Sequence, residues 1–406
     1  MNGVPLQNNS PSDLALEHVR QLNENVIVPL KQSFVGKDEI IDLLAVALVA
    51  RENLFLLGPP GTAKSALVRS IASRIDGRFF DYLLTKFTEP NELFGPFDIR
   101  KLREGDLVTN TEGMLPEADF VFLDELLNAN SSILNSLLMA LNERVFRRGR
   151  ETRPLPALMF VGASNRLPEE ESLNALFDRF LLRVRCDNVV DSQLPSVLQA
   201  GWAMQEVTDK PVGSVSIEGL RQIQSLVASV DLAPVMSSYI SAITRMRRAG
   251  IAVSDRRAVK LQRPIAASAL LCSRSTANVT DLWILRHCWD VEEQREVLAS
   301  IVESSMQQAT PDDKAVSHPQ SQGNEPPNAE EIAAALDRIL KLVNRESLPA
   351  DSQGTDNTIA PPSIALRDQL AELTTRSQWI SNETQRSYLQ AKCQTLWDLL
   401  KQLEGK

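Results

Sequence analysis

A glycine-rich segment of eight residues lies between an apolar run and an amphipathic helical pattern, the context in which such a segment binds phosphate. Its members are Gly58, Pro59, Pro60, Gly61, Thr62, Ala63, Lys64 and Ser65. Backbone N–H groups of this kind of loop converge on phosphates at the positive end of the following helix. Lys64 would then reach the β- and γ-phosphate oxygens, and the Ser65 hydroxyl would coordinate Mg²⁺. The flanking elements disfavour the alternative, a glycine-rich turn without a ligand.

One position in this phosphate loop, residues 58–65, departs from the usual pattern. A glycine ordinarily precedes the lysine, and here the residue is Ala63. Because glycine tolerates backbone conformations that other residues avoid, the methyl group should fit only if Ala63 keeps an ordinary backbone conformation.

Two carboxylates follow a buried apolar run at residues 120–123. We expect Asp124 to hold Mg²⁺ through water and Glu125 to act as the general base that activates the attacking water. Acidic pairs after strands also occur as simple helix starts, where they favour the helix dipole. The position of Asp124, 60 residues after Lys64, favours the catalytic interpretation.

Two further side chains have candidate roles. Asn165 ends a third apolar run and could orient the water and sense the γ-phosphate, although a lone asparagine there is otherwise a turn former. Arg179 precedes the apolar run from Phe180, and its alternative role is a surface partner for Asp178.

These residues need a sheet to position them. Apolar runs alternate with helical patterns between residues 53 and 186, which is typical of a sheet with helices on both faces. We predict strands at residues 53–57, 79–83, 120–123, 157–163 and 180–186, with helices at 66–75 and 133–142. The sequence therefore predicts a doubly wound α/β domain.

The rest of the chain has a helical pattern. We predict an α/β nucleotide-binding domain at 1–190, a smaller all-helical lid domain at 191–305, a flexible linker-rich segment at 306–362 with one short helix at 329–344, and a helical arm or hairpin at 363–406.

Composition narrows the function classes. A formal net charge of −9 over 406 residues argues against a protein that mainly coats nucleic acid. The four cysteines lack CxxC spacing, so neither a disulfide framework nor a zinc site is expected. No stretch is long and apolar enough to span a bilayer, and the N-terminus does not read as a signal peptide, which leads us to expect a cytoplasmic location.

The ordered motifs GPPGTAKS, FVFLDE, ASN and LFDRF, preceded by FVGK at residues 34–37, resemble the MoxR branch of the AAA+ ATPases, and most closely its RavA-like subgroup. The resemblance covers roughly residues 15–300. Further similar phrases are FGP at 94–96, LPEA at 115–118, LNER at 141–144 and VSDRR at 253–257.

This resemblance implies an AAA+ fold and an ATPase with ATP and Mg²⁺ as cofactors, assembled as a homo-oligomeric ring, usually a hexamer. Arg179 would be the finger that reaches the γ-phosphate of the neighbouring subunit. Arg256, with Arg257 as the alternative, would be the lid arginine that contacts nucleotide in its own subunit. Val35 and Gly36 would lie near the adenine.

The resemblance also implies a chaperone-like motor that remodels or activates a protein partner, often one with a von Willebrand factor A domain. Residues 88–118 correspond to an insertion that faces the ring pore in this branch and could contact a substrate. The large members of the subgroup have a β-rich insertion before a terminal helical bundle, and here only linker-like residues stand in that place.

Two other functions remain open on the sequence. The first is a nucleic-acid motor, for which the best basic cluster is Arg144, Arg147, Arg148, Arg150 and Arg153. This cluster has few interleaved aromatic residues, so a subunit boundary or a solvated loop is the favoured interpretation and nucleic-acid binding is not expected. The second is a chelatase-like motor that helps to insert a metal.

Overall fold

The computed structural model describes residues 11–104, 106–148, 151–169, 171–206, 215–307, 309–310, 313, 317–322, 332–333, 335–337, 339–340, 366, 370, 373–374, 377 and 383–404. Among these residues no helix is both long enough and apolar enough to cross a membrane.

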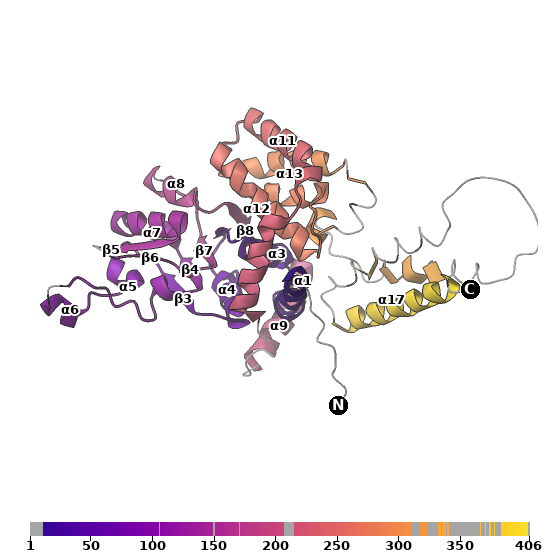
Figure 1. Cartoon of the computed structure of the whole chain (residues 1–406), viewed down its shortest axis with the longest axis horizontal. Helices are drawn as coiled ribbons and strands as arrows, with labels where there is room; N and C mark the ends of the chain where they lie inside the picture. Colours follow the sequence, from indigo (N-terminus) through magenta and orange to yellow (C-terminus); the bar gives the residue numbers. More distant parts are fainter. Residues whose placement is uncertain are drawn as a thin grey trace, which may run out of the picture.

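A parallel sheet of five strands, in the order β3-β4-β7-β1-β8, forms the centre of the molecule (Figure 1). The strands are β1 (Leu54–Leu57), β3 (Phe79–Leu83), β4 (Phe120–Asp124), β7 (Met159–Ser164) and β8 (Leu182–Arg185). All five predicted strands are confirmed. From β1 the chain passes to the far edge at β3, returns through β4 and β7, and then crosses β1 to β8. Because the crossovers run in both directions, helices cover both faces, as the doubly wound prediction requires.

The strand register places the carboxyl ends of all five strands at the same end of the sheet. Leu57 of β1 is paired with Ser164 of β7 and with Arg185 of β8. At the other edge Leu83 is paired with Asp124, the last residue of β4. In parallel sheets this end, at the point where the strand order reverses, is where ligands bind.

The helices of the α/β part pack their apolar faces on this sheet and on one another. They are α1 (Pro11–Leu22), α2 (Val28–Ser33), α3 (Asp38–Ala50), α4 (Lys64–Ser73), α7 (Ser131–Glu143), α8 (Glu171–Phe177) and α9 (Leu194–Glu206). All residues of α3 from Ile40 to Ala50 are buried, because this helix lies between the sheet and α12. The α7 helix begins where the Asn130 side chain accepts hydrogen bonds from Ser132 N and Ile133 N.

The described residues of the lid part are mainly helical. Its elements are α10 (Ile217–Leu226), α11 (Ala233–Arg248), α12 (Asp255–Leu271), a 3-10 helix at Val279–His287 and α13 (Gln294–Met306). The prediction of an all-helical segment is wrong at β9 (Val215–Ser216), which pairs with β2 (Ile75–Asp76) in a separate two-stranded sheet. A strand of two residues is too short to leave a period-two pattern in the sequence.

Two insertions extend from the sheet. The first, within residues 88–118, contains the short helices α5 (Pro90–Phe94) and α6 (Ile99–Arg103). The second is an antiparallel hairpin of β5 (Val145–Arg148) and β6 (Glu151–Pro154). Figure 1 shows α6 at the outer tip of the molecule, beyond β3 and far from the lid helices α11, α12 and α13.

Part of the segment predicted to be a flexible linker is packed. Residues 317–322 include a 3-10 helix at Pro319–Gln322, and His318 is 1% exposed. The His318 ring stacks on Trp283 with 4.7 Å between ring centroids, and Gln320 Nε2 donates to Asp42 Oδ2 at 2.8 Å. Polar composition predicted a linker here, and the single aromatic contact that fixes the segment has no sequence pattern.

The described C-terminal residues have a small apolar core of their own. Its members are Ile332, Leu336, Ile339, Leu366, Leu370, Leu373, Leu389, Cys393 and Leu396. The long helix α17 (Glu383–Glu404) contributes the last three. Residues from the short helix predicted at 329–344 therefore share one core with the predicted C-terminal helices.

Candidate active site

The phosphate loop follows β1 and leads directly into α4. Gly58 is required because a Cβ there would lie 2.1 Å from the carbonyl oxygen of Cys186, closer than real Cβ contacts. Thr62 is buried and its hydroxyl donates to Pro59 O at 3.0 Å, which closes the loop on itself. The exposed members are Pro59, Pro60, Gly61 and Ala63.

Ala63 has a left-handed backbone, with φ 67° and ψ 20°. This is not the ordinary backbone conformation in which we expected the methyl group of Ala63 to fit without strain. For an L-residue this conformation costs roughly 1–2 kcal/mol. The loop holds this shape because Thr62 and Lys64, on either side of Ala63, are both buried.

Three predicted phosphate and metal groups meet at the start of α4. The buried Lys64 ammonium donates to the carbonyl oxygens of Gly58 at 2.7 Å and Pro59 at 2.9 Å, which holds it over the loop. Ser65 Oγ donates to Asp124 Oδ2 at 2.9 Å. A hydroxyl and a carboxylate at this distance are suited to one Mg²⁺, and the first-turn N–H groups of α4 are suited to phosphate. These residues fit ATP with Mg²⁺.

Glu125 directly follows β4 and has a left-handed backbone with φ 50°. Its N–H donates to Asp124 Oδ1 at 3.0 Å, and its carbonyl accepts from Asn128 N at 2.9 Å. Burial, with Asp124 as a second cause, raises the pKa of Glu125, while the charges of Lys64 and Arg166 act in the opposite direction. A carboxyl with a raised pKa is suited to accept a proton from water.

The segment predicted to lie near the adenine packs against the residues that follow β8. Gly36 has φ 72°, and a Cβ there would meet Gln193 Oε1 at 2.7 Å and Val189 Cγ1 at 2.9 Å. Val35 precedes it, and the Lys37 ammonium bonds the carbonyl oxygen of Asp187. Since residues 187–193 continue from the carboxyl end of β8, this segment lies on the phosphate-loop side of the sheet.

Asn165 lies one residue beyond the carboxyl end of β7 and is exposed. The preceding residue, Ser164, is paired with Leu57 and accepts a hydrogen bond from Gly58 N at 3.0 Å. The structure therefore brings Asn165 to the same end of the sheet as the phosphate loop and Glu125.

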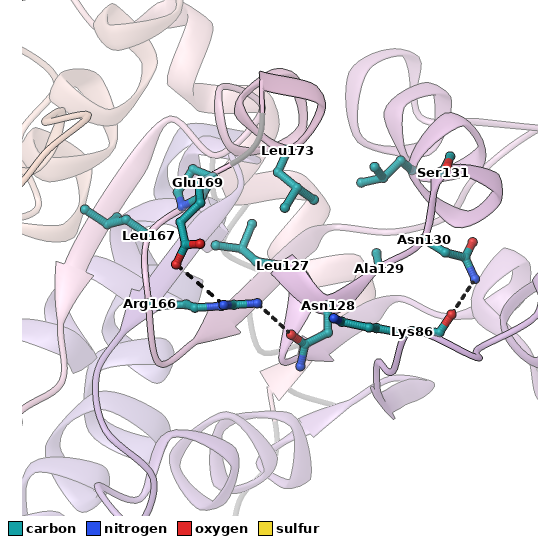
Figure 2. Close-up of a pocket in the computed structure, with 12 residues that line it drawn as sticks. Lys86, Leu127, Asn128, Ala129, Asn130, Ser131, Arg166, Leu167, Glu169 and Leu173 are labelled. Atoms are coloured by element: carbon teal, nitrogen blue, oxygen red, sulfur yellow. Dashed lines mark hydrogen bonds and ion pairs between the residues drawn. The ribbon is translucent and has the colours of Figure 1, made fainter.

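Arg166, which the sequence reasoning missed, extends into a cavity beside these groups. The cavity has a volume of about 290 Å³ and is lined by the loops after β3, β4 and β7. Figure 2 shows the Arg166 guanidinium between Glu169 and Asn128, with distances of 3.5 Å to each. Its position directly after Asn165 was the only sequence signal that could have identified it.

Arg179 lies at the opposite end of the sheet. It follows α8 and precedes β8, and its carbonyl oxygen accepts a hydrogen bond at 2.9 Å from Asn53, the residue before β1. Its guanidinium pairs with Asp178 at 3.1 Å, the alternative that the sequence offered. Arg179 Nε is buried and has no hydrogen-bond partner among the described residues.

Arg256 also lies at this amino end. Its guanidinium bonds Asn142 Oδ1 near the C-terminus of α7, and the neighbouring Leu141 carbonyl accepts a hydrogen bond from Asn53. This position differs from the expected contact with nucleotide in the same subunit. The lid helix α12, which begins at Asp255, packs on α3 and on the 3-10 helix at Val279–His287.

Arg257, the alternative lid arginine, is buried in an ion pair with Asp290 at 2.9 Å. The same carboxylate pairs with Arg183 of β8 at 2.7 Å. Burial lowers the pKa of Arg183 to about 10. Asp290 therefore joins the lid to the sheet through two buried guanidiniums.

Arg144, Arg148 and Arg153 of the basic cluster contact their own chain, whereas Arg147 is exposed. Arg144 lies over the Phe160 ring at 4.7 Å, and its Nη2 donates to Asn53 Oδ1 at 2.8 Å. Arg148 lies over the Phe97 ring at 4.1 Å and joins the hairpin to the α5–α6 insertion. Arg150 lies outside the described residues. These contacts give the cluster a structural role, so few of its guanidinium groups are available to bind nucleic acid.

The comparisons with known proteins agree with this geometry. Residues 20–225 match a family model described as the MoxR domain in the MoxR-vWA-beta-propeller ternary systems, and residues 236–302 match a model of an AAA lid domain. An uncharacterized protein of Methanocaldococcus jannaschii is 38% identical over 66% of this chain and 70% of its own length.

Two further relatives are more distant. Chaperone MoxR1 of Mycobacterium tuberculosis is 29% identical over 40% of this chain and 43% of its own length. A crystal structure of a candidate ATPase from Cytophaga hutchinsonii has a TM-score of 0.59 and 20% identity, and it covers 73% of this chain and 96% of that protein. At this identity the structural likeness shows the fold alone.

Proposed function

Because the chain belongs to the MoxR family of AAA+ ATPases, we propose that it binds ATP with Mg²⁺ and hydrolyses the γ-phosphate bond. The observation that carries this proposal is the meeting of three groups at one end of the sheet. Lys64 is held over the phosphate loop, Ser65 bonds Asp124 at 2.9 Å, and Glu125 follows directly.

Each group has a defined task in this reaction. Lys64 holds the β- and γ-phosphate oxygens, while Ser65 and Asp124 hold Mg²⁺, which neutralises charge that develops on the phosphates. Glu125 accepts the proton of the attacking water, and Asn165 orients that water. The raised pKa of Glu125 brings its proton affinity closer to that required of a general base near neutral pH.

The positions of two arginines favour a site shared between subunits. Arg179 and Arg256 both lie at the amino end of β1, and its four residues span roughly 13 Å to the phosphate loop. Neither guanidinium is positioned to reach a phosphate of its own chain. We propose that both act on the nucleotide of a neighbouring chain, so Arg256 acts in trans with Arg179.

A contact between the carboxyl end of one sheet and the amino end of the next is heterologous, and such contacts form a ring where the rotation between subunits closes. We therefore propose a homo-oligomeric ring, with a hexamer as the expected size. An arginine supplied by the neighbour stabilises transition-state charge and raises turnover by about 10³- to 10⁵-fold. Hydrolysis should then depend on assembly.

The work done by the ring is proposed to be remodelling or activation of a protein partner. The matching family is described by its association with a vWA protein, and a more distant relative is named a chaperone. The exposed apolar residues Ile99 and Leu102 of α6 offer a contact surface on the insertion that extends from the sheet (Figure 1).

Two variants test the reaction. Lys64→Ala should abolish ATP binding, whereas Glu125→Gln should bind ATP and not turn it over. Lys392→Ala, in the C-terminal unit, is the matched control and should keep both properties. Rapid hydrolysis by Glu125→Gln would remove Glu125 from the role of general base.

A separate experiment tests the partner. The full chain should co-purify with a vWA-domain protein of its host when Glu125→Gln and ATP hold the ring in its bound state, and less with Lys64→Ala. Equal recovery with both variants, or none with either, would contradict a nucleotide-controlled partner. Stimulation of ATPase by oligonucleotides instead would support the nucleic-acid motor.

A further inference from the structure

We propose that Asp178 of one subunit enters the cavity beside Arg166 of its neighbour, and that this contact releases Arg179 to act on the shared nucleotide. The inference rests on the proposed function, because it requires the amino end of one sheet to face the carboxyl end of the next. It adds a specific pair of charges, neither of which belongs to the nucleotide-binding groups.

The cavity has the charge and the space for a carboxylate. Among the described residues that line it, Lys86 and Arg166 are basic and Glu169 is acidic, so these three charged side chains sum to +1. In Figure 2 the Lys86 side chain and the Arg166 guanidinium both point toward Asn128. A volume of about 290 Å³ is ample for one acidic side chain.

The present partners of Arg166 hold it weakly. Its contacts with Glu169 and Asn128 are both 3.5 Å long, and the side chain of Glu169 is 76% exposed. Exposed ion pairs of this kind contribute little to stability. Loss of the contact with Glu169 therefore costs little, and Arg166 is available to a carboxylate from a neighbouring subunit.

Asp178 is the acid that the neighbour would bring to this position. It directly precedes Arg179, so an Arg179 that points at the γ-phosphate carries Asp178 to the surroundings of Asn165 and hence of Arg166. In the single chain Asp178 instead pairs with Arg179 at 3.1 Å, and this pair must open before Arg179 can face a phosphate.

The two ends cannot meet within one chain. Arg166 follows the carboxyl end of β7, whereas Asp178 precedes β8 at the amino end, and the sheet between them spans roughly 13 Å or more. Assembly thus replaces two weak ion pairs within chains, Arg166–Glu169 and Asp178–Arg179, with one ion pair between chains. Arg179 is then free to face the nucleotide.

The test is a reciprocal charge swap in the full chain. Arg166→Glu and Asp178→Lys should each lower the ATPase rate at least about tenfold, because each places like charges at the contact. The double variant should recover to within roughly threefold of the wild type, since the swapped pair attracts again. Failure of the double variant to recover, when it is folded and binds ATP, would overturn the proposal.

Alanine variants keep the test informative if a swapped chain does not fold. In a double-mutant cycle, Arg166→Ala with Asp178→Ala should lose no more activity than either single change. Fully additive losses would contradict the contact. Asp255→Lys is the matched control, because Asp255 is a second exposed acid beside Arg256 at the same end of the sheet. It should not rescue Arg166→Glu, and rescue would remove Asp178 as the specific partner.

These experiments distinguish a wrong Asp178–Arg166 contact from a wrong proposal of a site shared between subunits. If the specific ATPase rate of the wild-type chain rises with protein concentration but the swap does not rescue, only the Asp178 contact is wrong. If the wild-type chain is monomeric by sedimentation at a concentration where it hydrolyses ATP at its full specific rate, the ring itself is contradicted.

Discussion

Replacement of Ala63 by glycine should stabilise the protein. This is the opposite of the usual effect of an Ala→Gly substitution. The left-handed φ of 67° costs an alanine roughly 1–2 kcal/mol, and glycine avoids that cost. Glycine also increases the entropy of the unfolded chain, which offsets roughly 0.4–1 kcal/mol of the gain. The net expectation for Ala63→Gly is a stabilisation of about 0–1.6 kcal/mol, with a midpoint of roughly 0.8 kcal/mol.

The matched control is Ala66→Gly, three residues further along. Ala66 is exposed like Ala63, but it lies inside α4 with a helical backbone. There glycine is less favourable than alanine by about 1 kcal/mol, so this variant should be destabilised. The two substitutions are chemically identical and should have opposite signs.

Urea and thermal unfolding of the three proteins measure the difference. For a domain of this size, 1 kcal/mol shifts the midpoint by roughly 2–4 °C, so Ala63→Gly should melt above the wild type and Ala66→Gly below it. If Ala63→Gly is destabilised as much as Ala66→Gly, Ala63 does not have a left-handed backbone and the account of the loop is wrong.

Two other substitutions test the packing of the lid. Burial lowers the pKa of His318 to about 4, below its ordinary value of 6.5. The buried neutral ring therefore contributes its full stabilisation above pH 6.5, and this stabilisation is lost as the pH falls toward 4. The full loss is about 3 kcal/mol. Urea midpoints at pH 7.5 and 4.5 should therefore differ less for His318→Gln than for the wild type or for the control His18→Gln, and an unchanged difference would contradict a buried neutral ring. Asp290→Ala removes the carboxylate that two buried guanidiniums share and should destabilise the protein by roughly 3–5 kcal/mol in urea unfolding; a loss below 1 kcal/mol would show that these charges are solvated.

The sheet and the phosphate loop could be predicted because their signals are local. Five apolar runs became five strands. Gly58, Asp124 and Asn165 each lie at the last residue of a strand or directly after it, so all three are at one end of the sheet. In a parallel sheet this follows from strand direction alone. Membership of the MoxR family, which the ordered motifs indicated, is confirmed.

Other features could not be predicted because distant parts of the chain decide them. The position of Arg256 depends on where the lid packs, and nothing near residue 256 encodes the end of the sheet that it reaches. The packed segment around His318 depends on the ring of Trp283, 35 residues earlier. The backbone of Ala63 depends on the loop around it, because the residue type alone predicts the opposite conformation.

The most direct test of a site shared between subunits is to mix two inactive variants. Arg179→Ala keeps Glu125 and lacks the finger, whereas Glu125→Gln keeps the finger and lacks the general base. In randomly mixed rings about a quarter of the interfaces combine an intact Glu125 with an intact Arg179 from the next chain. Recovery of ATPase toward that fraction of the wild-type rate is predicted, and no activity above the sum of the separate variants would contradict the shared site.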